Sequence, residues 1–209
     1  MNNINENEIK LLTFWNKYKI VIISIPVISF LLIGYIVIST QVQKANNTKA
    51  ASIYYDWSYA ISSQNQDEES KFFNELISQY PKSGYAQIAL LNQANANVNL
   101  GDIDLALQNL NKLIEITNGI NGNKIYNKIA KVSSARLLYS KGEYNKALNM
   151  IEEYSAVSTN AYIHELTGDI LVKLNKVDLA RLQYEKASEK YKDQTSITIV
   201  AMKIADLGL

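Results

Sequence analysis

One uncharged apolar stretch precedes a series of amphipathic segments. Residues Ile20 to Ile38 include no charged side chain, and these 19 residues would form a helix about 28 Å long at about 1.5 Å per residue. That length matches a hydrocarbon core of about 30 Å. A signal-peptide core is shorter, about 7–15 residues, and precedes a small-x-small cleavage site, which Val37-Ile38-Ser39 resembles poorly. The pattern therefore predicts a retained transmembrane helix over residues 20–40.

The residues that flank this stretch predict its orientation. Three lysines precede it and two follow it, at positions 10, 17, 19, 44 and 49. Basic residues favour the cytoplasmic side of a membrane. We therefore expect a short cytoplasmic tail over 1–19 and a periplasmic domain over 41–209, with the opposite orientation as the alternative.

Three later segments, beginning at Gln87, Lys128 and Ala161, share one pattern. In each, apolar residues recur at spacings of three and four, as a buried helix face requires. The shared positions are a small residue (Ala94, Ala135, Gly168), a turn (Gly101-Asp102, Gly142-Glu143, Asn175-Lys176) and an alanine five residues after the turn begins (Ala106, Ala147, Ala180). This arrangement resembles the tetratricopeptide repeat, in which small residues let two antiparallel helices approach closely.

The chemistry of the turns fits such helix pairs. Gly or Asn can adopt the left-handed conformation that ends a helix, and Asp102 or Asp104 is expected to cap the following helix. One pair cannot bury its apolar face alone, so several must stack. We predict an all-α fold in which a single N-terminal transmembrane helix precedes a tetratricopeptide-like α-solenoid, with units near 50–82, 87–117, 128–155 and 161–191 and a capping helix over 194–208.

Composition narrows the function further. Lys and Arg total 21 against 20 acidic residues, so no strong field attracts nucleic acid. The chain has no cysteine, which excludes thiol catalysis, cysteine-bound zinc and disulfides. His164 is the only histidine, and a buried structural role is expected for it. Asp102 and Asp104 lack the further ligands of a calcium loop. We predict a protein that is not an enzyme and has no cofactor or metal.

The repeat register predicts a binding surface. In a tetratricopeptide solenoid, positions 2, 5, 9 and 12 of each first helix line the concave face. Those positions are Ile88, Leu91, Asn95 and Val98, then Ile129, Val132, Arg136 and Tyr139, then Tyr162, Glu165, Asp169 and Val172. Among them we expect partner contacts at Asn95, Val98, Arg136, Tyr139, Tyr162, Glu165 and Asp169, with the two tyrosines and the arginine as the main anchors. Solvated inner-face charges without a partner are the alternative.

A second aromatic group, in the first unit, allows two interpretations. Tyr54, Tyr55, Trp57 and Tyr59 lie close together in the sequence. They form either the core of this unit or an exposed partner-binding surface.

The order of these parts resembles the YfgM-like family, known as the ancillary subunit of the Sec translocon. The segment "NENEIKLLTFWNKYKIVIISI" is similar to the family's acidic start, aromatic-basic stretch and single span, and "MKIADLGL" is similar to its closing helix. The resemblance implies a bacterial inner-membrane protein whose periplasmic domain associates with the SecYEG channel, with translocating polypeptides and with a membrane-anchored periplasmic chaperone of the prolyl isomerase type. It implies a non-enzymatic role in the folding or handover of translocated proteins, with no catalytic residues. The alternative is a tetratricopeptide assembly factor for the cell envelope or the division machinery.

Overall fold

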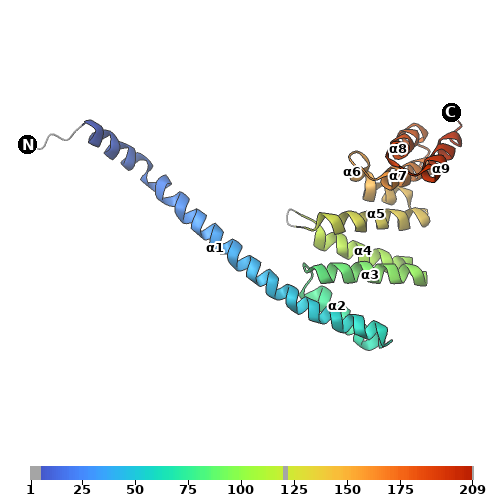
Figure 1. Ribbon diagram of the computed structural model, residues 1–209, viewed down its shortest axis with the longest axis horizontal. Helices are drawn as coiled ribbons and strands as arrows, with labels where there is room; N and C mark the ends of the chain where they lie inside the picture. The colour runs from blue at the N-terminus through green and yellow to red at the C-terminus, as the bar shows by residue number, and fades with distance from the viewer. Residues whose placement is uncertain (1–5, 120–121, 209) are drawn as a thin grey trace, which may run out of the picture.

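The computed structural model describes residues 6–119 and 122–208, and all regular structure in these ranges is α-helical, which confirms the predicted all-α class. The helices follow one another as a long helix and a stack of shorter ones (Figure 1). They are α1 (Glu6–Ser62), α2 (Gln66–Gln79), α3 (Gly84–Leu100), α4 (Ile103–Thr117), α5 (Lys124–Ser140), α6 (Tyr144–Ser155), α7 (Ala161–Lys173), α8 (Val177–Lys190) and α9 (Gln194–Ala205).

Helix α1 joins the apolar stretch to the solenoid without a break. It is 57 residues long and contains Pro26, which spanning helices tolerate. Within the described residues, α1 is the one helix long and apolar enough to cross a membrane. Its N-terminal part stands away from the other helices, whereas its C-terminal part packs against α2 and α3 (Figure 1). The same helix therefore serves as the apolar segment and as the first helix of the first pair.

Each of the three later pairs turns through the same hydrogen-bonded loop. The positive-φ residue is Gly101, Gly142 or Asn175, with φ of 83°, 78° and 57°. The amide of the next residue donates to a carbonyl five residues back, and the amide of the positive-φ residue donates to one three residues back. These two bonds satisfy carbonyls that the helix end leaves free, and the predicted left-handed turns are confirmed.

The prediction that Asp102 or Asp104 caps the helix after the first of these turns is wrong. Asp102 precedes α4 but its side chain makes no capping bond, and the carboxylate of Asp104 instead accepts a hydrogen bond from Lys141 on α5. The turn holds Asp102 at φ −82° and ψ 66°, outside the extended backbone that capping residues adopt, while its amide donates to the carbonyl of Asn97 over 2.8 Å. Among the described helices, side-chain caps begin five others: Asn65 begins α2 at the turn end of the stack, and Ser83, Asn123, Asn160 and Asp193 begin α3, α5, α7 and α9 at the opposite end.

The small residues predicted from the repeat lie between the helices. Ala106, Ala147 and Ala180 are fully buried, each in a cluster with residues of neighbouring helices. Gly168 of α7 lies so close to Tyr184 of α8 that a Cβ at this position would collide with the ring. The axes of paired helices therefore approach each other most closely at positions with small side chains.

The aromatic group of α1 divides between core and surface. Trp57 is buried and lies in a cluster with Leu76 and Ala86. Tyr55 and Tyr59 are 71% and 63% exposed on the other side of the same helix. Trp57 therefore belongs to the core of the first unit, whereas Tyr55 and Tyr59 lie on its surface.

Candidate functional site

The predicted concave-face residues differ in their exposure. Asn95 on α3 and Arg136 on α5 are exposed, whereas Val98 and Tyr139 are half-buried against the core. Tyr162 at the start of α7 is 39% exposed. The first helices thus present a discontinuous surface, in which single polar groups alternate with core contacts.

A groove lies between the N-terminal halves of α5 and α7. It has a volume of about 540 Å³ and includes Ile129, Val132 and Tyr162 from the predicted set. Ile125, which the repeat register did not select, also lines it and is 72% exposed. Lys124 and Lys128 contribute to the same lining. The α5–α7 groove therefore combines apolar side chains with a basic rim.

Two predicted residues, Glu165 and Asp169, are occupied by contacts with the C-terminal helix. Lys203 of α9 lies 2.7 Å from the Oε1 of Glu165 and 2.8 Å from the Oδ1 of Asp169. Tyr191 donates a hydrogen bond of 2.6 Å to Glu165, and Tyr184 donates one of 2.8 Å to Asp169. These five side chains form a closed network, the Lys203 cluster.

The Lys203 cluster favours the charged forms of Glu165 and Lys203. Burial opposes ionisation of Glu165, but hydrogen bonds from Lys203 and Tyr191 outweigh it and lower the pKa of this carboxyl. Burial also opposes the charge on Lys203, yet the hydrogen bonds to Asp169 and Glu165 raise the pKa of its ammonium group. Burial and then the negative charge of Asp169 raise the pKa of Tyr139 on α5. The cluster thus couples α7 to α9 and extends its field to α5.

The repeat pattern did not predict Lys203 as part of this surface. Lys203 lies 34 residues from Asp169 in the sequence, on a helix that the pattern identifies only as a cap. One feature could have pointed to it, because α9 is the next first helix of the series and Lys203 is the basic residue in its last turn. Consequently Glu165 and Asp169 are less available to a partner than Arg136, Tyr139 and Tyr162.

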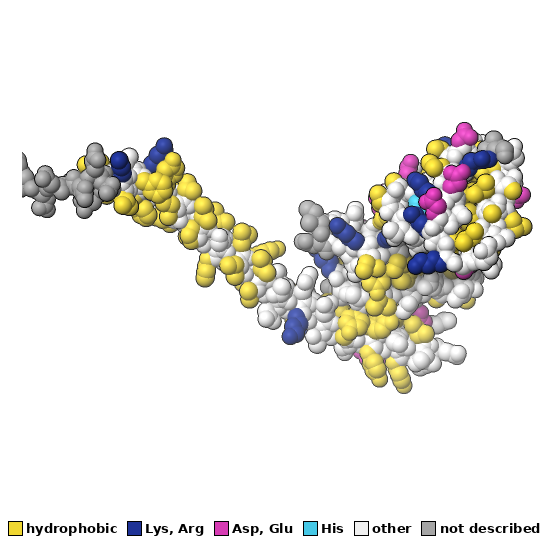
Figure 2. Space-filling model, turned by 45° about the horizontal axis from the view of Figure 1, so that its top comes forward, with side chains coloured by type: hydrophobic (Ala, Val, Ile, Leu, Met, Phe, Trp, Pro, Cys, Tyr) yellow, Lys and Arg dark blue, Asp and Glu magenta, His cyan; other side chains and the backbone are white. Residues whose placement is uncertain are grey.

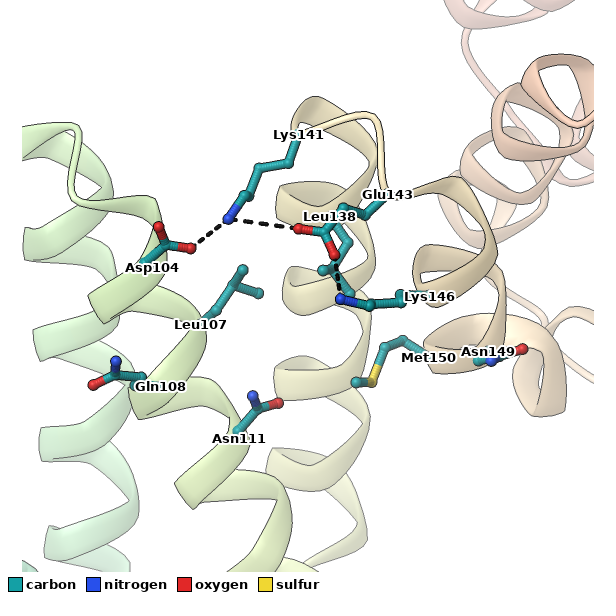
Figure 3. Close-up of a pocket in the computed structure, with 10 residues that line it drawn as sticks. All are labelled: Asp104, Leu107, Gln108, Asn111, Leu138, Lys141, Glu143, Lys146, Asn149 and Met150. Atoms are coloured by element: carbon teal, nitrogen blue, oxygen red, sulfur yellow. Dashed lines mark hydrogen bonds and ion pairs between the residues drawn. The ribbon is translucent and has the colours of Figure 1, made fainter.

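A second hollow lies mainly on α4 and α6, the second helices of their pairs. It contains none of the residues predicted for the concave face. It has a volume of about 480 Å³ between α4, α5 and α6. Leu107, Leu138 and Met150 point into it, and a chain of ion pairs crosses one end (Figure 3). The chain runs from Asp104 through Lys141 and Glu143 to Lys146.

The charged side chains at this end of the hollow are paired with one another. The hydrogen bond to Asp104 is the main cause that raises the pKa of Lys141, and the hydrogen bond from Lys146 lowers the pKa of Glu143. Each charge therefore has a partner, and surface pairs of this kind join neighbouring helices weakly.

Catalytic chemistry finds no support in the described residues. His164 is 1% exposed, with its Nδ1 2.8 Å from the Oε1 of Gln183 and its Nε2 3.0 Å from the carbonyl oxygen of Ser158. The predicted buried, structural role of His164 is confirmed. Within the described ranges no three His, Asp or Glu side chains are grouped so that they could hold a metal ion.

Comparison with known proteins identifies the repeat. The model of the tetratricopeptide repeat-like domain family matches residues 13–209. The chain belongs to this family. Two solved structures of MamA, one titled MamA RS-1 ArsTM double mutant, have TM-scores of 0.53 and 0.54 to this chain at 16% and 15% identity. They cover 77% and 76% of this chain and 94% and 86% of their own. At such identity the likeness shows the fold alone, and it agrees with the predicted tetratricopeptide-like solenoid.

Three curated relatives share one name, ancillary SecYEG translocon subunit. The relative from Haemophilus influenzae is 27% identical over 151 residues, which are 71% of this chain and 71% of that protein. The relative from Buchnera aphidicola is 23% identical over 172 residues, 74% of this chain and 87% of its own. The relative from Aggregatibacter actinomycetemcomitans is 24% identical over 151 residues, 72% of this chain and 71% of its own. The resemblance to the YfgM-like family is confirmed, and with the apolar α1 it supports a membrane-anchored protein.

Proposed function

We propose that this chain is a membrane-anchored, non-enzymatic protein-interaction scaffold that associates with the SecYEG translocon. There it works with periplasmic chaperones, including a membrane-anchored one of the prolyl isomerase type, in the folding or handover of translocated polypeptides. The observation that carries the proposal is the match to three proteins named ancillary SecYEG translocon subunit, over 71–74% of this chain. The family supports it, since repeat solenoids use extended surfaces to bind other proteins.

In this proposal the N-terminus is cytoplasmic and the solenoid is periplasmic. The three lysines before the apolar stretch, against two after it, favour that orientation. The domain then begins directly at the membrane, because α1 continues from the apolar stretch into the first helix pair. A partner that emerges from a channel beside α1 would meet the solenoid at once.

The α5–α7 groove is the part of the concave face best suited to an unfolded or extended segment. Its exposed apolar side chains, Ile125 and Tyr162, are 72% and 39% exposed. Exposed apolar and aromatic side chains provide most of the binding energy at protein interfaces. Arg136 and Tyr139 extend the same first-helix surface along α5. We therefore keep Tyr139, Tyr162 and Arg136 as the principal contacts, with Asn95 and Val98 on α3 beside them.

Photo-crosslinking in cells tests this surface. A photoreactive residue placed at Arg136, Tyr139 or Tyr162 should capture the translocon, the chaperone or a nascent polypeptide, whereas one at Lys112 on α4 or Lys186 on α8 should not. Replacement of each of the three by Ala should weaken binding by more than about 1 kcal/mol and leave the fold intact. Capture from the two outer positions alone would show that the concave face is the wrong surface.

The identity of the captured protein separates this role from the alternative. Components of the cell envelope or of the division machinery in place of translocon subunits would favour an assembly factor. Capture of the translocon without any chaperone would support the association with the translocon but would contradict the proposed handover to chaperones.

A further inference from the structure

One edge of the solenoid carries the loops between repeats. This edge lies beside the part of α1 that directly follows the apolar stretch 20–38. A hollow of about 740 Å³ is lined both by Tyr35 and Ser39 of α1 and by Asn118 and Asn123 of the α4–α5 loop. A second hollow joins Gln43 and Asn47 of α1 to the loop between α2 and α3. The solenoid is thus folded back beside the segment of α1 that leaves the apolar stretch (Figure 1).

The depth of this segment follows from the apolar stretch. If residues 20–38 fill the hydrocarbon core, the headgroup layer extends about 5–7 Å further, since a whole bilayer measures about 40–45 Å. At about 1.5 Å per residue that layer includes roughly the next four residues of α1. Ser39 and Gln43, which face the two loops, therefore lie in or at the headgroup layer. The loops must lie at the same level.

The loop edge has more basic than acidic side chains, with three exposed lysines against one exposed carboxylate, that of Asp193. We define the loop edge as the described segments 80–84, 118–119, 122–125, 156–161 and 191–194. Lys82, Lys124 and Lys192 of this edge are exposed, and among the described residues none of them takes part in an ion pair. Val157 is 78% exposed on the same edge.

The opposite edge, which carries the turns within repeats, is richer in acidic residues, and Lys141, Lys146, Lys173 and Lys176 also lie there. Acidic residues are concentrated there, with Asp67, Glu68 and Glu69 in the first turn of α2 and Asp102 and Asp104 at the start of α4. In the view of Figure 2, most acidic side chains lie on the part of the solenoid far from the apolar stretch, where basic ones are mixed with them, whereas the side of the solenoid nearest to α1 shows basic side chains. The domain is nearly neutral as a whole, and its acidic side chains are more frequent at the turn edge than at the loop edge.

We propose that the loop edge binds the anionic surface of the lipid bilayer, so that the solenoid lies against the membrane beside its own anchor. Lysines within a Debye length of anionic headgroups are attracted to them, and the attraction weakens with added salt. Val157 and the loop backbone contact the headgroup layer, while the acidic edge faces away. The α5–α7 groove then opens beside the bilayer, because Lys124 belongs both to the edge and to the groove lining.

The test uses the full-length chain in lipid nanodiscs, without any translocon. The chain has no cysteine, so one introduced cysteine carries one fluorescent label. Val157→Cys on the loop edge and Leu100→Cys at the other end of α3 form a matched pair, because the native side chains are 78% and 76% exposed. A nitroxide attached to lipid headgroups quenches a label that touches the membrane surface. In phosphatidylglycerol-containing nanodiscs we expect strong quenching at 157 and little at 100.

Charge variants separate lipid binding from simple proximity. Lys82→Gln with Lys124→Gln should shift the equilibrium of the edge on the membrane by about fivefold for each lysine removed. Lys173→Gln with Lys176→Gln removes the same charge from the opposite edge, where both lysines are exposed, and should have no effect. Equal quenching at 157 and 100, or quenching at 157 that ignores both the lysine pair and the lipid charge, overturns the proposal. Contact at 157 that appears only when a translocon is added makes the edge a protein interface and also overturns it.

Discussion

Single small residues decide how closely the paired helices approach. Gly168 is the clearest case, because a Cβ there would overlap the ring of Tyr184. We expect Gly168→Ala to lower the free energy of unfolding by about 1–3 kcal/mol through overpacking, although alanine favours a helix over glycine by about 1 kcal/mol. Thermal unfolding of the full-length protein in detergent measures the effect.

Gly84→Ala is the matched control for this substitution. Gly84 begins α3, and a Cβ there has no neighbour within 4 Å. The control should leave the stability unchanged or raise it by up to about 1 kcal/mol. Equal melting temperatures for the two variants would show that α7 and α8 do not approach each other as closely as the structure has them.

The Lys203 cluster gives the stability a pH dependence whose sign is defined. Because the folded pKa of Glu165 is lowered from 4.5, its contribution is complete above about pH 4.5 and is lost as the pH falls through the folded value. Because the folded pKa of Lys203 is raised from 10.5, its contribution is complete below about pH 10.5 and is lost as the pH rises through the folded value. The cluster therefore stabilises the fold fully over the neutral range.

Lys203→Met tests this window. It leaves two partly buried carboxylates without their cation and should cost about 1–3 kcal/mol near neutral pH. The difference from the unmodified protein should shrink in acid, where Glu165 becomes neutral, and denaturation midpoints across the pH range would record it. Lys192→Met removes an exposed lysine and serves as the control. A cost that is the same in acid and at neutral pH would assign it to lost packing instead of charge.

At the scale of the helix pair, three alanines define the repeat register. Ala106, Ala147 and Ala180 are fully buried. Replacing any one by Leu should overpack its pair and cost about 1–3 kcal/mol, whereas Ala96→Leu on the exposed side of α3 should cost little. Chemical denaturation of the four variants measures the difference. No loss of stability in any of the three buried variants would mean that the register is wrong.

The sequence predicted those features of the helix pairs that depend on near neighbours. The left-handed turns at Gly101 and Asn175 and the buried alanines repeat with the pattern, because each pair must meet the same local packing requirement. Ion pairs between successive first helices do not repeat from pair to pair, so the pattern alone did not predict that Lys203 would neutralise Glu165 and Asp169. The expected cap at Asp102 failed for a local reason, since the turn holds this residue at φ −82° and ψ 66°, outside the extended backbone that a capping residue adopts.

The candidate site was predictable only in part for the same reason. Register alone places Tyr162, Ile129 and Val132 on one surface, and all three line the α5–α7 groove. It could not select Ile125, whose exposure depends on how the N-terminal ends of α5 and α7 diverge. Nor could it show that α1 continues unbroken from the apolar stretch into the first helix pair. The sequence predicts a helix on each side of this junction, but the pattern does not reveal whether the two are joined.

At the scale of the whole molecule, the continuous α1 makes the apolar segment and the solenoid one structural unit. Ala50, Trp57 and Ala60 near its C-terminal end are buried in the domain. Upstream, the helix continues without interruption through residues 20–38. The length of this apolar run and its poor cleavage site predict that it stays attached and crosses the membrane once.

Mass spectrometry of the protein purified from membranes tests this retention. The intact mass should include the apolar run, and the protein should resist extraction by alkaline carbonate, which releases proteins held only by surface contacts. A processed form that begins at Thr40 or later would contradict the prediction. In that form the first helix pair would remain, because its buried residues begin at Ala50, but the solenoid would lose its anchor. Attraction of the loop edge to lipid would then be its only hold on the membrane, and high salt would release it. Retention in the membrane at high salt therefore distinguishes a kept anchor from surface binding alone.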